Sequence, residues 1–178
     1  MWYDHVKTEW LLWVDADIVL TLDVLEMLWK TADKNSKPVV SGVYFISKQM
    51  ESSLMQPMPA LFNEIGDEFQ IQYLHPLPFN EVVKVDCAGL GLTLMHRSVV
   101  PKLRAISPEY SVFAEQENLG EKYVGEDIVF FRNLKIDPCL LPGVFQLSAA
   151  VQRVLHLQLI FSAGVILVGH YAAAFVPS

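Results

Sequence analysis

An apolar run that ends in two acids constrains this chain most strongly. Trp10–Val14 contains only apolar residues and is followed directly by Asp15-Ala16-Asp17. A short apolar run of this kind is typical of a strand that is buried on both faces. Open α/β sheets bind their ligands at the carboxyl ends of such strands. The run therefore predicts a buried strand that presents carboxylates at the edge of an α/β sheet.

The next residues predict a helix and a second strand. Thr21 can cap a helix that runs to about Asp33, and its apolar stripe consists of Leu22, Leu25, Leu28 and Trp29. Residues 35–38 end this helix, and residues 39–46 are rich in β-formers. Strand, helix, strand is the order that builds a parallel sheet. We therefore expect an α/β fold with a mostly parallel sheet flanked by helices.

The middle of the chain has weaker signals. Residues 47–80 are rich in Met, Pro, Gln and Glu without a sustained period, which predicts a long excursion from the framework. Strands are predicted over residues 82–85 and 90–96, and a short helix over residues 98–104. We therefore expect the framework to resume after the excursion.

The composition excludes several kinds of partner and compartment. The chain has 178 residues, of which 52% are hydrophobic and 19% charged, so we expect a single domain over residues 1–178. The formal charge of -7 argues against a nucleic-acid partner, because such binding depends on Lys and Arg. Cys87 and Cys139 form no C-x-x-C pair, and the N-terminus lacks the order of a secretory signal. A reducing, cytoplasmic location is expected.

The C-terminal stretch over residues 154–176 has no Asp, Glu, Lys or Arg and is long enough to cross a bilayer as a helix. Its content of His156, Gln158 and His170, with no basic cluster after it, favours buried strands of the sheet instead. Association with a membrane is therefore not favoured.

Asp15 and Asp17 are two positions apart, so their side chains point to one side if the strand geometry continues through them. Converging carboxylates suit Mg²⁺ or Mn²⁺, which prefers oxygen ligands and keeps positions open for substrate phosphates. The alternative is that the acids only solvate the end of a strand. An isolated D-x-D pattern does not decide between the two.

Other polar residues also have both a chemical and a structural interpretation. Glu126 and Asp127 begin a helix whose apolar face contains Ile128, Phe131 and Leu134. These acids either offset the helix dipole or include a general base. Gly89 and Gly91 are either turn glycines or positions at which the backbone approaches a ligand. His170 follows a long apolar run, where a histidine is either a core residue or a metal ligand.

Several segments, taken in order, resemble the family 2-like glycosyltransferases of the GT-A fold: WLLWVDADI, PVVSGVYF, VDCAGLGLTLMHRSV, GEDIVFFRNL and VGHY. The resemblance implies a metal-dependent, inverting glycosyltransferase. The implied donor is a nucleotide sugar such as a UDP- or GDP-sugar, and the implied acceptor is a hydroxyl of a glycan, lipid or protein.

The resemblance also implies roles for the acids and glycines. Asp15 and Asp17 occupy the D-x-D positions, which in this family bind Mn²⁺ or Mg²⁺ and the donor diphosphate. The segment that contains Ala88, Gly89 and Gly91 matches the one that lines the donor-sugar and acceptor site.

The remaining roles concern the reaction itself. By this resemblance Asp127 is the catalytic base that deprotonates the acceptor hydroxyl, and Glu126 helps to position the acceptor. His170 completes the metal shell. The metal stabilises the departing nucleoside diphosphate.

The chain departs from the family pattern in two segments, and these change the domain that we expect. Only nine residues precede Trp10, where the family has a strand-helix repeat that holds the nucleotide base. Residues 142–166 are also longer and more apolar than the usual link to the histidine. We therefore expect a partial catalytic domain that lacks part of the N-terminal nucleotide-binding half.

Two other functions compete with transfer. The apolar run with Asp15-x-Asp17 also fits the first motif of haloacid-dehalogenase-type phosphatases, in which Asp15 would be a nucleophile. No lysine is well placed for that chemistry. The second competitor is a non-catalytic truncated remnant that folds, or pairs with a partner, without turning over substrate.

Overall fold

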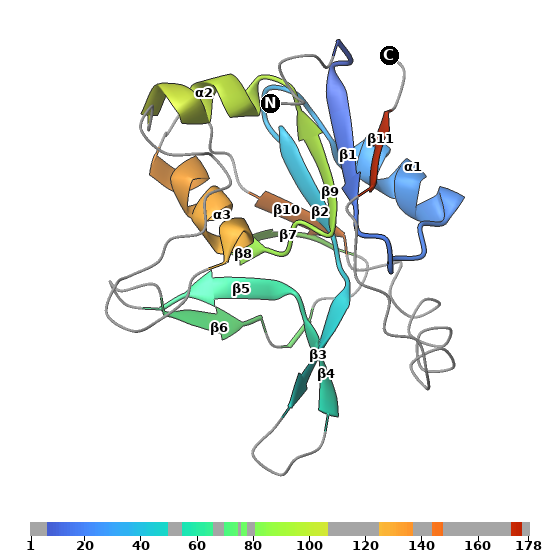
Figure 1. The fold of residues 1–178 in the computed structure, drawn as a ribbon, viewed down its shortest axis with the longest axis vertical. Helices are drawn as coiled ribbons and strands as arrows, with labels where there is room; N and C mark the ends of the chain where they lie inside the picture. Colours follow the sequence, from blue (N-terminus) through green and yellow to red (C-terminus); the bar gives the residue numbers. More distant parts are fainter. Residues whose placement is uncertain are drawn as a thin grey trace.

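A six-stranded sheet forms the centre of the molecule. The computed structural model describes residues 7–49, 55–65, 70–74, 76–77, 81–106, 125–136, 144–147 and 172–175. In spatial order β11, β1, β9, β2, β10 and β7, the central strands are Ala172–Phe175, Trp10–Val14, Leu92–His96, Val39–Gly42, Val144–Leu147 and Val82–Val85. Figure 1 shows two smaller sheets below this one.

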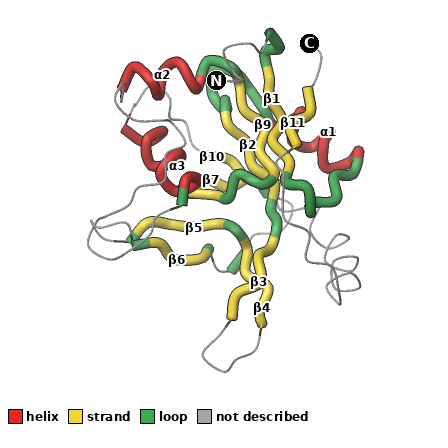
Figure 2. Tube along the Cα trace, viewed as in Figure 1, coloured by secondary structure: helices red, strands yellow, loops and turns green. Residues whose placement is uncertain are grey.

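Alternation of apolar side chains gives the sheet two buried faces. One face presents Leu11, Val39 and Met95, and the other presents Leu12, Val40 and Leu94. Helix α1 (Leu22–Thr31) packs on the second face, while α2 (Val99–Ile106) and α3 (Glu126–Ile136) pack on the first. The helices thus cover both faces of the sheet, as Figure 2 shows in red against the yellow strands.

Helix α1 forms where its local signals predict it. The Thr21 hydroxyl accepts a hydrogen bond of 3.4 Å from the Val24 amide, which satisfies one of the free N–H groups of the first turn. The Ala32 amide donates to the Leu28 carbonyl at 2.9 Å and closes the last turn. The predicted strand at Trp10–Val14 and the helix after Thr21 are therefore confirmed.

The prediction of a mostly parallel sheet is wrong for the described strands. Strand β9 lies between β1 and β2 and is antiparallel to both, and β2–β10 is the one parallel pair among the described strands. Leu94 pairs with Leu12 on one side and with Val40 on the other. The β1–α1–β2 unit therefore crosses over a strand that the chain supplies later, and the sheet is mixed.

The described part of residues 47–80 lies outside the central sheet, as predicted, but it contains strands of its own. Strands β3 (Phe45–Gln49) and β4 (Met55–Pro59) form a two-stranded sheet. A three-stranded sheet follows, built from β6 (Ile71–Tyr73), β5 (Leu61–Glu64) and β8 (Cys87–Ala88). These short strands lack a clear alternation, and β4 contains prolines, which edge strands tolerate.

The apolar C-terminal stretch is described only in part. Ala172–Phe175 forms β11, which is antiparallel to β1 at one edge of the sheet, and residues 154–171 and 176 lie outside the described residues. Within the described part of the chain, no helix is long and apolar enough to span a membrane.

Candidate functional site

Asp15 and Asp17 follow β1 in a turn rather than in an extended strand. The Ile18 amide donates to the Asp15 carbonyl at 3.0 Å, and the Asp15 amide donates to the Gly91 carbonyl at 2.8 Å. The strand therefore ends at Val14, and the condition under which both acids share one side of a strand is not met. Asp15 is half-buried while Asp17 is exposed.

The Asp15 carboxylate lies among other negative charges. Burial raises its pKa, and the charges of Asp17, Glu126 and Asp127 raise it further. Its Oδ1 atom is buried and has no hydrogen-bond partner among the described residues. Crowded carboxylates of this kind are costly unless a cation or a proton offsets them. The fold thus brings together acids that are more than a hundred residues apart in the sequence.

Asp127 lies in the first turn of α3, where the peptide dipoles favour negative charge. Its Oδ1 accepts a hydrogen bond of 2.8 Å from the Ile128 amide. Burial nevertheless raises the pKa of Asp127, and the charge of Glu126 adds to this effect. A carboxylate with a raised pKa is a stronger proton acceptor, which suits a general base.

Backbone hydrogen bonds and a buried hydroxyl pair hold Gly89. Its amide donates to the Ala60 carbonyl at 2.9 Å, and its carbonyl accepts a longer bond of 3.5 Å from the Thr93 hydroxyl. Thr93 in turn lies 2.9 Å from the Ser41 hydroxyl, and both side chains are buried. This chain of contacts fixes the segment from Gly89 to Gly91 on the sheet.

Both glycines are required by what packs against them. A Cβ atom on Gly89 would fall on the Tyr44 hydroxyl, 2.7 Å from its Cζ. A Cβ atom on Gly91 would collide with the Asp15 carboxylate and lie 2.9 Å from the Tyr44 Cζ. The space beside these glycines therefore holds Tyr44 and Asp15.

Tyr44 is a site residue that the sequence analysis missed. Its hydroxyl accepts a hydrogen bond of 3.2 Å from the Gly91 amide. Burial raises its pKa, and the charges of Asp15, Asp127 and Asp17 contribute to the rise, so the hydroxyl keeps its proton and remains a donor. Tyr44 lies two residues beyond Gly42, the last residue of β2. Ligands of α/β sheets bind at such strand ends, and this position was the signal available in the sequence.

The carboxylates of Asp15 and Asp17 fit a divalent cation only together with further ligands from the substrate. The described residues contain no group of three or more His, Cys, Asp or Glu side chains placed to hold a metal ion. Asp15 and Asp17 nevertheless offer carboxylates, and Mg²⁺ is commonly bound by one or two carboxylates together with substrate phosphates. The orphaned Oδ1 of Asp15 is an oxygen that such a cation would satisfy.

Two predicted site residues do not join this arrangement. Ala88 lies in β8 with 1% of its surface exposed, so its side chain belongs to the core. His170 lies outside the described residues.

Comparison with known proteins shows the family of the chain. A model of the family described as glycosyl transferase family 2 matches residues 3–103, more than half of the chain. No curated protein matches the sequence. Among solved structures, the crystal structure of A197 from STIV is similar at 18% identity and a TM-score of 0.45, over 84% of this chain and 59% of that one. The chain thus spans 59% of the length of that protein.

Proposed function

Because the chain belongs to glycosyl transferase family 2, we propose that it transfers a sugar from a nucleotide-sugar donor to an acceptor hydroxyl. The observation that supports this most directly is that Asp17, Glu126 and Asp127 lie close enough to Asp15 for their charges to raise its pKa. A site for a cation, a diphosphate and a proton acceptor needs such a set of carboxylates.

In this proposal the acids after β1 bind the donor. Asp15 and Asp17 hold Mn²⁺ or Mg²⁺ and, through it, the diphosphate of a UDP- or GDP-sugar; His170 is the proposed further ligand. When bound, the cation supplies positive charge against the leaving nucleoside diphosphate. It would also offset the repulsion that raises the pKa of Asp15.

Asp127 is the proposed base of an inverting reaction. The acceptor hydroxyl, which is part of a glycan, lipid or protein, gives its proton to Asp127. Its oxygen forms a bond to the anomeric carbon while the bond from that carbon to the diphosphate oxygen breaks. The raised pKa of Asp127 favours this proton transfer. Glu126, beside it, positions the acceptor.

The glycine segment and Tyr44 complete the proposed donor site. Tyr44 keeps a hydroxyl proton among carboxylates, and the Gly91 amide that donates to its oxygen polarises it further. We assign this proton to an oxygen of the donor. Gly89 and Gly91 line the site with backbone, and Ala88 contributes only by holding that backbone in β8.

Transfer assays with Asp127→Asn test the proposal. Purified protein is incubated with UDP- and GDP-sugars, Mn²⁺ and mixed acceptors, and both released nucleoside diphosphate and glycosylated product are measured. Asp127→Asn should lower transfer by about 100-fold or more with little change in donor binding, because a base acts in the transition state. Asp23→Asn, which changes an exposed acid in the first turn of α1, is the matched control. Retention of most of the transfer rate in Asp127→Asn would place the base elsewhere.

The same preparation separates the competing functions. A phosphatase with Asp15 as its nucleophile would hydrolyse an aryl phosphate with Mg²⁺, whereas we expect no such hydrolysis. The family match favours the transferase interpretation of the Asp15-Ala16-Asp17 segment. Donor binding without transfer to any acceptor would favour a non-catalytic remnant.

A further inference from the structure

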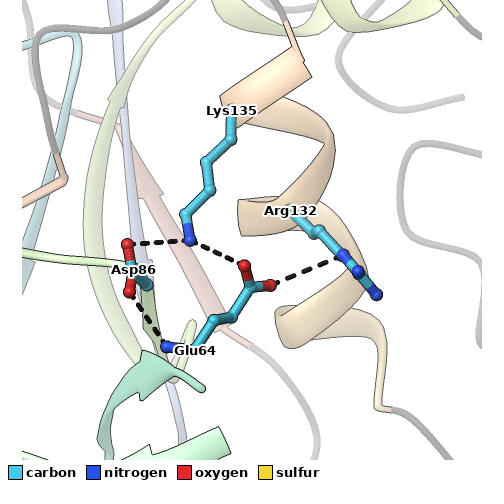
Figure 3. Close-up of polar contacts among 4 residues, drawn as sticks. All are labelled: Glu64, Asp86, Arg132 and Lys135. Atoms are coloured by element: carbon cyan, nitrogen blue, oxygen red, sulfur yellow. Dashed lines mark hydrogen bonds and ion pairs between the residues drawn. The ribbon is translucent and has the colours of Figure 1, made fainter. Parts of the chain in front are cut away.

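Charged side chains connect α3 to the three-stranded sheet, on the side of the helix drawn in Figure 3. Lys135 Nζ lies 2.8 Å from Asp86 Oδ1 and 2.9 Å from Glu64 Oε2. Arg132 Nε lies 3.5 Å from Glu64 Oε1, and the Glu64 amide donates to Asp86 Oδ2 at 2.9 Å. We refer to Glu64, Asp86, Arg132 and Lys135 as the α3 clamp.

The clamp is shielded from solvent, unlike an ordinary surface ion pair. Its side chains are between 21% and 34% exposed. Burial raises the pKa of Asp86, but hydrogen bonds from Lys135 and from the Glu64 amide outweigh this and hold it below its usual value. Burial lowers the pKa of Lys135, but its bonds to both carboxylates raise it overall. Asp86 and Lys135 are therefore charged at neutral pH.

Apolar packing alone does not fix the position of α3 on the sheet. Ile128, Val129, Phe130 and Phe131 are consecutive and all buried, so the helix is apolar nearly all round at this level. Hydrophobic contacts are non-directional, whereas a connected polar network favours one arrangement. The clamp therefore supplies the directional contacts that fix how α3 lies on the sheet.

The elements that the clamp joins carry the two halves of the site. Helix α3 begins at Glu126 and Asp127, about 12 Å along its axis from Lys135 at 1.5 Å per residue. Asp86 directly precedes β8, which leads into Gly89. Glu64 ends β5, which pairs with β8. A shift of α3 on this sheet would move its acids relative to the glycine segment and Asp15.

We propose that the α3 clamp sets the position of Asp127 against Asp15 and the glycine segment, with Lys135 and Arg132 as positioning residues that touch no substrate. The proposal rests on the proposed function only through the role of Asp127 in transfer. The placement itself is measurable in the absence of substrate. A misplacement of about 1 Å at a reacting group costs about 100-fold in rate, so a modest shift would be visible in catalysis.

The test compares Lys135→Met with Lys30→Met. Lys30 lies 2.8 Å from Glu26 on α1, a pair of the same length whose side chains are 74% and 52% exposed. The reporter is the carboxyl ¹³C titration of Asp15, whose pKa is raised by burial and by acids that include Glu126 and Asp127. We expect Lys135→Met to lower the Asp15 pKa towards its ordinary value. Lys30→Met should leave it unchanged.

Further variants distinguish a change in the position of α3 from the direct effect of the Lys135 charge and from a change in the stability of the protein. In a Glu126→Gln/Asp127→Asn background, Lys135→Met should no longer move the Asp15 pKa, because no charged reporter remains at the start of α3. Lys135→Arg, which keeps the charge, should restore much of the wild-type value. In transfer assays, Lys135→Met should lower kcat by about 10- to 100-fold with little change in the donor KM.

The outcomes are distinguishable from failure of the proposed function. Absence of transfer in the wild-type protein would refute that function and leave the titration readable. A lower urea midpoint in Lys135→Met, with the Asp15 pKa and kcat as in Lys30→Met, would overturn the clamp proposal, because the contacts would then only stabilise the fold. If Lys135→Met does not fold, Arg132→Met provides the same comparison, and an unchanged Asp15 pKa in that variant would overturn it.

Discussion

Gly91→Ala should lower the stability of the fold and also weaken cation binding at the candidate site. The new Cβ atom would collide with the Asp15 carboxylate and lie 2.9 Å from the Tyr44 Cζ, so both side chains must move. The φ angle of Gly91 lies outside the left-handed range, so alanine meets no backbone strain there. The effect therefore comes from displaced side chains alone.

The size of the effect follows from what has to move. Turning the Asp15 carboxylate away from its preferred rotamer costs about 0.5–1.5 kcal/mol. Overpacking against the partly buried Tyr44 ring costs about 1–3 kcal/mol. We expect a loss of about 1.5–4.5 kcal/mol in the free energy of unfolding, which is the sum of these ranges. Because Asp15 is the proposed metal ligand, Mn²⁺ affinity should also fall by about tenfold or more, equivalent to about 1.4 kcal/mol.

Urea unfolding and Mn²⁺ titration by electron paramagnetic resonance measure the two effects. Gly42→Ala is the matched control, because its Cβ would collide with the Leu92 side chain, 2.9 Å from the Cγ, and meets no acid. We expect Gly42→Ala to lose stability while keeping its Mn²⁺ affinity. Equal Mn²⁺ affinity in Gly91→Ala and the wild type would refute the assignment of Asp15 as a ligand.

Three further substitutions have expected outcomes. Burial raises the pKa of Asp127, so the stability that this carboxyl group contributes is fully present below its ordinary pKa of 3.8 and is lost as the pH rises through the raised value. Asp127→Asn should therefore raise the thermal midpoint at pH 7 and not at pH 3. Ser41→Ala should lower the free energy of unfolding in urea by about 1 kcal/mol, because it leaves the Thr93 hydroxyl with only its long bond to the Gly89 carbonyl. The double variant Ser41→Ala/Thr93→Val should lose less stability than the sum of the two single changes. Tyr44→Phe should cost about 1–3 kcal/mol, because it leaves the buried Gly91 amide without an acceptor, and an unchanged midpoint would show that this bond is not formed in solution.

Local signals in the sequence predicted the elements that carry the acids. The apolar run before Asp15 gave β1, the Thr21 hydroxyl gave the start of α1, and the acids Glu126 and Asp127 gave the start of α3. Each of these signals acts within a few residues, so no knowledge of neighbouring strands was needed.

Features that depend on contacts between distant segments were not predictable in this way. The insertion of β9 between β1 and β2 depends on strand pairing, which a single strand pattern does not specify. The contact between Lys135 and Glu64 spans 71 positions in the sequence. The Tyr44 hydroxyl gains its place only through packing against Gly89 and Gly91. These contacts define how the predicted acids are held.

Calorimetric titration of UDP and GDP tests most directly whether the acids after β1 form a cation-dependent nucleotide site. Each titration is run with Mn²⁺ and with EDTA, on the wild type, on Asp15→Asn and on the control Asp23→Asn. We predict that Mn²⁺ tightens binding by about tenfold or more in the wild type and the control, equivalent to about 1.4 kcal/mol, and that Asp15→Asn abolishes this gain. Equal affinity in EDTA, or a full Mn²⁺ effect in Asp15→Asn, would contradict the assignment of Asp15 to the donor site.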